Sequence, residues 1–265
     1  MRPCSSPYED PFGPVFGDPE VDAACGPAAW LASMLAAEAA LADALAAAGV
    51  IPDDAAKAIG EACRSDAVTT DVFALAASAS PVVPLVAALG EAVPPHAAGW
   101  VHYGATSQDI MHTAMMLVSQ RATAVISERL AAAAGAAASL ADRHRDTLQI
   151  GRTLGQHAAP TTFGTLAAGW LGGIDAARAE LDRARRGLAA QLGGPVGILE
   201  GHAGQGLPIL RDFARRLGLA DPVVPWHTER TRPARLAAAL AMVAGGLGKV
   251  ARDVTVLGSG DVGEL

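Results

Sequence analysis

Apolar positions recur with helical spacing along most of the chain, and the helical segments become much longer after residue 107. In the N-terminal part, prolines and glycines separate short segments that predict helices over residues 19–48 (bent near Pro27), 52–64, 71–78 and 81–92. Later segments predict long helices over residues 107–146, 160–192 and 229–256, with a short helix over 208–217 inside a glycine-rich linker. No segment shows the alternation of a strand. The pattern therefore predicts an all-α protein.

The change in helix length also predicts how the chain is organised. We expect a small helical N-terminal domain over residues 1–104 and an incomplete central bundle of long helices over residues 105–265. Long helices with alanine-rich apolar faces bury little of that surface within one copy of the chain. Association with further copies is therefore expected.

Composition narrows the classes of function. Hydrophobic residues make up 51% of the chain but aromatic residues only 4%, so alanine, leucine and valine must form the interior. A net charge of −7 without a basic stripe excludes nucleic-acid binding. The scattered Cys4, Cys25 and Cys63 fit a reducing, cytoplasmic location. The opening residues lack the apolar region of a signal peptide, and charge or turn residues interrupt every long apolar run. Neither a signal peptide nor a membrane span is expected.

The stretch over residues 102–114 (HYGATSQDIMHTA) places short polar side chains where a long helix is predicted to begin. Thr106, Ser107 and Gln108 lie beside the free N–H groups and the positive dipole end of that helix, which is a good place to hold an anion. Asp109 suits the first turn and is a candidate for orienting a neighbour. His102 is a candidate donor to the same anion, or a residue that ties the loop. An ordinary helix cap is the alternative interpretation of the whole stretch.

A second polar cluster occupies residues 151–164 (GRTLGQHAAPTTFG), directly before the next predicted long helix. Pro160 fits a first helical turn, and the guanidinium of Arg152 matches a carboxylate. Thr153 and Gln156 add hydrogen-bonding groups, while His157 adds a titratable ring beside a helix start. Two polar helix starts in an otherwise apolar chain predict an anion site built between helices.

These two stretches resemble the first two signature regions of the fumarase/adenylosuccinate lyase superfamily. They are most similar to its 3-carboxy-cis,cis-muconate cycloisomerase branch, in which Leu154 replaces a histidine that many other members carry. The segment 225–232 (PWHTERTR) also looks like a motif of that branch. His112 stands where relatives usually show aspartate, and Ser80 where they often have asparagine. A third signature of the superfamily, Gly-Ser-Ser-x-Met-Pro-x-Lys-x-Asn, does not occur in this sequence, although residues 260–265 resemble the segment before it.

The resemblance implies a homotetramer whose subunits share active sites. It also implies a lactonising cycloisomerase that acts on a carboxylated cis,cis-muconate in protocatechuate catabolism, without a metal or organic cofactor. The spacing of the histidines likewise suggests no metal site. Ser107 and His157 are the expected catalytic residues. The expected substrate-binding residues are His102, Thr106, Ser107, Gln108, Asp109, Arg152, Thr153, Gln156, His227 and Arg230.

Two alternatives remain open at this point. The same carboxylate-stabilising chemistry would serve a lyase that releases fumarate by β-elimination. The absence of the third signature would also fit a non-catalytic remnant of such an enzyme.

Overall fold

The computed structural model describes residues 13–69, 71 and 80–265, and its residues form two compact units. The first unit comprises the described residues up to 122 together with 186–230, and the second comprises 123–185 and 231–265. Helices dominate both units, with one two-stranded sheet, so the prediction of an all-α fold is confirmed apart from that sheet. The domain boundary expected after residue 104 stays a prediction.

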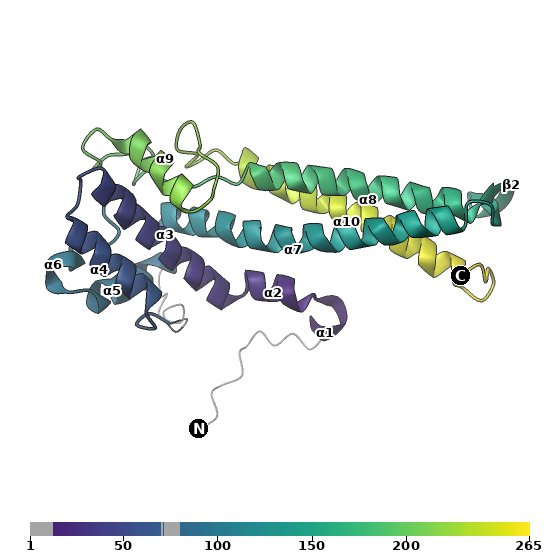
Figure 1. Cartoon of the computed structure of the whole chain (residues 1–265), viewed down its shortest axis with the longest axis horizontal. Coiled ribbons are helices and arrows are strands. Elements are labelled where there is room, and N and C mark those ends of the chain that lie inside the picture. The colour runs from purple at the N-terminus through teal and green to yellow at the C-terminus, as the bar shows by residue number, and fades with distance from the viewer. Residues whose placement is uncertain (1–12, 70, 72–79) are drawn as a thin grey trace, which may run out of the picture. The chain divides into compact units, whose positions relative to one another are not determined.

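The first unit is a cluster of short helices (Figure 1). Its helices are α1 (Gly13–Phe16), α2 (Pro19–Cys25), α3 (Pro27–Ala47), α4 (Asp53–Arg64), α5 (Val82–Ala92), α6 (Pro95–Ala98), α9 (Gly206–Arg216) and the beginning of α7 (Ser107–Arg143). α3 lies against both α4 and α9. The helix predicted over 19–48 is divided at Gly26, because Pro27 has no N–H to continue α2 and instead opens α3. Apart from Asp71, the helix predicted over 71–78 lies outside the described residues.

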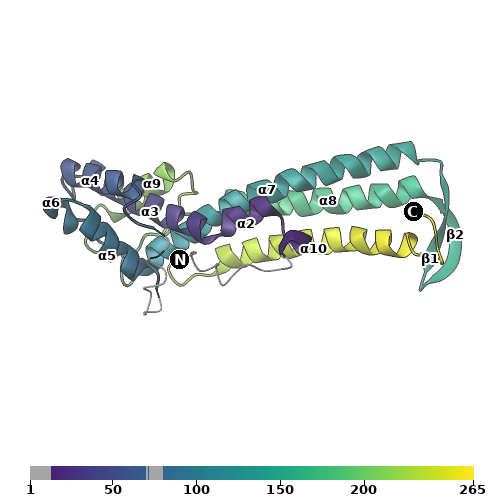
Figure 2. The ribbon, with the colours of Figure 1, turned by 90° about the horizontal axis from the view of Figure 1, so that it is seen from below.

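The second unit contains three long helical segments that lie side by side (Figure 2). These are α7 from Thr123 onward, α8 (Phe163–Arg186) and α10 (Thr231–Leu257). Their facing sides share a core that includes Leu130, Trp170 and Leu181. The Trp170 indole N–H donates to the Asp253 carboxylate at 2.7 Å, so the polar atom of this buried ring is satisfied.

A β-hairpin joins α7 to α8, and the sequence did not predict it. Strand β1 (Leu148–Thr153) pairs antiparallel with β2 (Gln156–Thr162), and α8 begins only at Phe163. The helix predicted to start at Pro160 is therefore wrong at that end, since Pro160 pairs with Ile150 inside the hairpin. A two-stranded sheet has only edge strands, where proline is tolerated. Most hairpin side chains are exposed, so no apolar alternation marks the strands.

Gly164 allows α8 to start close against the end of α7. A Cβ atom at this position would lie 2.6 Å from the Arg145 Cα and 2.7 Å from the Ala141 carbonyl oxygen. We expect Gly164→Ala to lower the free energy of unfolding by about 1–3 kcal/mol, because backbone atoms must move apart. The matched control is Gly172→Ala in the same helix, where a Cβ atom meets nothing within 4 Å. Equal stability of the two variants in urea unfolding would contradict this assignment.

In the described part of the chain, three helices are long and apolar enough, by length and composition alone, to cross a membrane: α3, α7 and α10. By this criterion, the expectation that no segment could span a membrane is not met. The reason is that α3, for example, carries only Glu38 and Asp43 as charged residues among its many alanines and leucines. The most apolar part of α3 is 61% buried within the chain itself.

Candidate active site

The first polar stretch forms a capping box at the start of α7. The helix begins at Ser107, as predicted, and the Asp109 carboxylate reaches back to accept the Thr106 N–H at 3.0 Å. Asp109 is completely buried, whereas Thr106 and Ser107 are partly exposed. The exposed edge of this helix start therefore carries two hydroxyl groups, and the aspartate beneath holds their backbone in place.

Asp109 also connects α7 to the segment before the glycine-rich linker. Its carboxylate also accepts hydrogen bonds from the Gly194 N–H at 2.9 Å and from the Gln191 side-chain amide at 3.0 Å. The backbone of Gln191 exchanges two hydrogen bonds with the Thr113 hydroxyl, each 2.9 Å long. Gln191 is fully buried and was not a candidate from sequence. It stands at the end of an apolar run, and only its position after folding reveals its role.

The segment over residues 225–232 packs onto the same part of α7. The Gln191 side chain accepts the Trp226 N–H at 2.9 Å and lies 3.2 Å from the His227 Nδ1, while Gln108 donates to the His227 carbonyl oxygen. The Arg230 guanidinium lies 5.3 Å from the centre of the Trp226 ring. The structure thus brings Gln108, Asp109, His227 and Arg230 of the same chain together.

His112 contributes an uncharged ring to this cluster. It stacks on Trp226 with a ring separation of 5.4 Å, and its Nε2 lies 3.3 Å from an Arg230 nitrogen. Burial and the neighbouring Arg230 and His227 lower the pKa of His112 to about 4. The ring therefore accepts a hydrogen bond from Arg230 at neutral pH. Among the described residues, Arg230 otherwise contacts carbonyl oxygens and no carboxylate, so its charge is not neutralised locally.

This lowered pKa predicts a loss of stability in acid. The unfolded chain binds a proton at His112 near the ordinary pKa of 6.5, whereas the folded chain binds it only near pH 4. The free energy of unfolding should fall as the pH drops from about 6.5 to about 4. His112→Gln should weaken this dependence, and His96→Gln, at an exposed position, should not. An identical pH dependence of Tm in wild type and His112→Gln would contradict the assignment.

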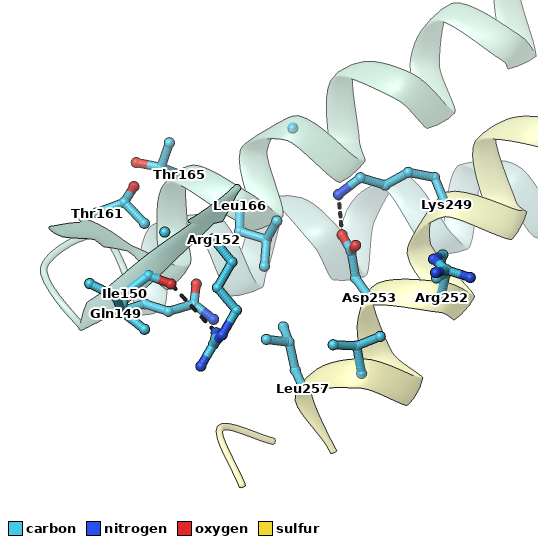
Figure 3. Close-up of a pocket in the computed structure, with 13 residues that line it drawn as sticks. Gln149, Ile150, Arg152, Thr161, Thr165, Leu166, Lys249, Arg252, Asp253 and Leu257 are labelled. Carbon is cyan, nitrogen blue, oxygen red and sulfur yellow. Dashed lines mark hydrogen bonds and ion pairs between the residues drawn. The ribbon is translucent and has the colours of Figure 1, made fainter. Parts of the chain in front are cut away.

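The second polar stretch lies in the other unit, on the hairpin. Arg152 in β1 makes a two-pronged ion pair with Glu264, at 3.0 and 2.6 Å, and Gln149 donates to the same carboxylate at 2.7 Å. The hydrogen bonds from Arg152 and Gln149 lower the pKa of Glu264 to about 2. Arg152 also lines a cavity of about 560 Å³, together with Lys249 and Arg252 of α10 (Figure 3). Lys249 in turn pairs with Asp253, which lines the same cavity, so Arg152 and Lys249 each have a carboxylate partner within this unit.

The remaining candidates from this stretch lie at the exposed tip of the hairpin. Thr153, Gln156 and His157 are all exposed. Leu154 and Gly155 form the turn, with φ angles of 51° and 74°. The expectation that His157 sits beside a helix start is wrong, because it lies on β2 instead. The catalytic role of His157 stays a prediction. A site formed jointly by residues 102–114 and 151–164 also stays a prediction, since the two stretches belong to different units.

Comparison with known proteins decides the family. A family model described as Lyase matches residues 25–265. The chain belongs to the fumarase/adenylosuccinate lyase superfamily. Its superfamily relatives include a nitrosuccinate lyase of Streptomyces davaonensis, 43% identical over 96% of this chain. A 3-carboxy-cis,cis-muconate cycloisomerase of Bradyrhizobium diazoefficiens is 42% identical, also over 96% of this chain.

Solved structures of the superfamily agree with this assignment. The 3-carboxy-cis,cis-muconate lactonizing enzyme of Pseudomonas putida is 37% identical, with a TM-score of 0.89 over 95% of this chain. The chain spans 56% and 57% of the two relatives named above and 58% of the P. putida structure. Among the described residues, no group of three His, Cys, Asp or Glu side chains is placed to hold a metal ion.

Proposed function

We propose that this protein is a cycloisomerase that closes a lactone ring on a carboxylated cis,cis-muconate, within the aromatic catabolism that supplies such polycarboxylates. The observation that carries the proposal is the placement of Arg230 against the first two turns of α7, where its guanidinium bonds to His112 and to the His227 carbonyl oxygen that also accepts from Gln108. A guanidinium without a carboxylate partner, next to a helix N-terminus, favours a bound carboxylate. Several relatives of 36–42% identity that carry the cycloisomerase name support the same choice.

The proposed reaction needs groups that bind carboxylates and one group that delivers a proton. One substrate carboxylate attacks the conjugated diene and forms a C–O bond, and the displaced π electrons move toward the carbon next to a second carboxylate. That carboxylate carries the developing charge as an enolate-like form, and a proton then adds to the carbon. We assign carboxylate binding to Thr106, Ser107, Arg152, Thr153 and Arg230, orientation to Gln108, Asp109 and Gln156, and proton handling to His157.

The test is turnover of 3-carboxy-cis,cis-muconate by the protein expressed from its complete gene. Lactone formation breaks the conjugation, so the diene absorbance should decay in proportion to the enzyme concentration. Ser107→Ala should slow the decay without loss of folding, because the hydroxyl contacts the substrate and not the core. A folded wild-type protein that leaves the absorbance unchanged would refute the proposed reaction.

A second reaction is favoured by one comparison. The nitrosuccinate lyase relative is as similar as the cycloisomerases, and its name indicates elimination from a substituted succinate. Loss of a proton from one carbon and of nitrite from its neighbour would leave an unsaturated dicarboxylate such as fumarate. This reaction also passes through a carboxylate-stabilised carbanion, so the same side chains would serve it. Release of fumarate and nitrite from nitrosuccinate is the corresponding assay.

We also propose that the protein works as a cytoplasmic homotetramer with shared active sites. The support is the exposed apolar surface of α10, where Met242, Leu247, Val254 and Val256 are 39–47% exposed. Such a surface is stabilised by packing against other helices. Packing of this kind also accounts for the apolar character of α10 without a membrane. Sedimentation equilibrium should therefore give a mass four times that of the chain.

A further inference from the structure

We propose that Glu38 is a positioning residue that holds the His102 ring so that its Nε2–H binds a substrate carboxylate. The inference rests on the proposed function and adds to it a residue from α3 that no motif contains. The His102 Nδ1 lies 2.6 Å from the Glu38 Oε1, across 64 positions of sequence. A distance this short is typical of a charge-assisted hydrogen bond.

The burial of Glu38 shows why the pairing matters. Its side chain is 1% exposed, on a helix whose other buried residues are mainly alanine and leucine. An isolated carboxylate is costly to bury, and a cationic partner offsets much of that cost. His102 is the partner of Oε1, and Oε2 is buried without a hydrogen-bond partner among the described residues. The contact with His102 is therefore the interaction that compensates the burial of the Glu38 side chain.

The backbone independently fixes the direction of the ring. His102 has a φ angle of 60°, in the left-handed region that residues other than glycine seldom adopt. Its carbonyl oxygen accepts the Ala105 N–H at 3.2 Å, which closes a tight turn immediately before Thr106. Backbone conformations of this kind persist where surrounding contacts impose them, and they are concentrated at functional sites. Turn and carboxylate together leave the ring little freedom.

The charges around the ring favour its protonated form. Burial acts to lower the pKa of His102, but the hydrogen bond and charge of Glu38 and the charge of Asp109 outweigh it, so the pKa is raised. The His202 ring lies close to Gly104 in the adjacent turn, where an added Cβ atom would be 3.1 Å from its Nε2. Since Nδ1 is engaged by Glu38, Nε2 is the nitrogen available for a ligand, on a side chain that is 17% exposed. A cation there adjoins the anion-favouring start of α7.

Histidine titrations by NMR test the pairing without any need for turnover. We expect the pKa of His102 in the wild-type protein to lie above the ordinary histidine value of 6.5. Glu38→Gln should lower the pKa of His102 by about one unit or more, a tenfold or larger loss of proton affinity. The matched control is Asp54→Asn, which removes the carboxylate 3.7 Å from His96 at the surface and should shift His96 far less. A His102 pKa at or below 6.5 would overturn the proposal even if Glu38→Gln does not fold.

A dicarboxylate probe tests the second half of the proposal. Added fumarate should shift the His102 signal and leave that of His96 in place, and Glu38→Gln should weaken the response. No response of His102 to fumarate would overturn a role in carboxylate binding. If the response is present but neither muconate nor nitrosuccinate is turned over, the proposed reaction fails while the Glu38–His102 pair stands.

Stability gives a further readout of the same pair. Because the folded pKa of His102 is raised, the stabilisation is complete below the unfolded value of 6.5 and is lost as the pH rises through the folded pKa. The Tm of the wild-type protein should therefore fall as the pH rises from 6.5 through the folded pKa of His102. The Tm of Glu38→Gln should not fall in this way over the same pH range. An unchanged dependence in the variant would contradict the charged pairing.

Discussion

Replacing Asp109 by alanine is expected to lower the free energy of unfolding by about 3–5 kcal/mol, because it leaves several buried donors without an acceptor. The carboxylate accepts the backbone N–H groups of Thr106 and Gly194 and the amide of Gln191, all at 2.9–3.0 Å. The residue is 0% exposed, so water does not replace it. Urea denaturation measures this loss of unfolding free energy, and the dependence of that free energy on urea concentration should equal that of the wild type.

Two further variants sharpen this prediction. Asp109→Asn keeps one acceptor oxygen but turns an NH₂ group toward a donor, so its stability should fall between those of wild type and Asp109→Ala. Asp66→Ala, at an exposed position, is the matched control and should change stability by less than about 0.5 kcal/mol. If Asp109→Ala costs no more than the control, Asp109 does not organise the start of α7.

Arg152→Lys is expected to lower kcat/KM by at least about tenfold while the protein remains folded. Lysine keeps the positive charge but loses the planar pair of donors that a carboxylate accepts. The guanidinium is held in place by Glu264, and Arg152 lines the neighbouring cavity. The measurement is steady-state kinetics of the protein from its complete gene, together with Tm.

The alternative role for Arg152 is to fasten the hairpin to the segment after α10. In that case Arg152→Lys and Glu264→Gln would lower Tm by similar amounts, and kcat/KM would be unchanged. Arg145→Lys is the matched control, since Arg145 forms an exposed pair with Asp142. A fall in Tm with unchanged kcat/KM would therefore remove Arg152 from substrate binding.

The sequence predicted those features that local chemistry determines. The start of α7 at Ser107 follows from the polar cap at Thr106 and the acidic side chain three residues later. Helices α4 and α5 begin one residue after the predicted positions, because a proline precedes each start. Both helices end at the predicted residue, where Ser65 follows α4 and the β-branched Val93 follows α5. Both signals act over a few residues and need no tertiary context.

The hairpin could not be predicted in the same way. Its turn consists of Leu154 and Gly155, both with positive φ. Turns of this kind usually have asparagine or aspartate before the glycine, and that sequence signal is missing here. Arg152 finds its partner in Glu264, 112 residues further along. Contacts of this range depend on how α10 packs, which no local pattern encodes.

Two buried polar residues of the candidate site were missed for a related reason. Glu38 looks like one solvated charge in an alanine-rich helix, and only the packing of α3 places it against His102. Gln191 lies in a segment predicted to end a long helix, whereas α8 actually ends at Arg186 and leaves Gln191 free to bond with Asp109 and Thr113. A buried polar side chain reveals its function through its partners.

We propose that this superfamily site closes a lactone ring on a carboxylated muconate. A single competition experiment tests it most directly: the protein from its complete gene is given 3-carboxy-cis,cis-muconate and nitrosuccinate at equal concentration, and the products are followed by proton NMR. We expect signals of the lactone to appear first and the rate of lactone formation to fall in Arg152→Lys. Fumarate forming while the muconate signals stay constant would contradict it.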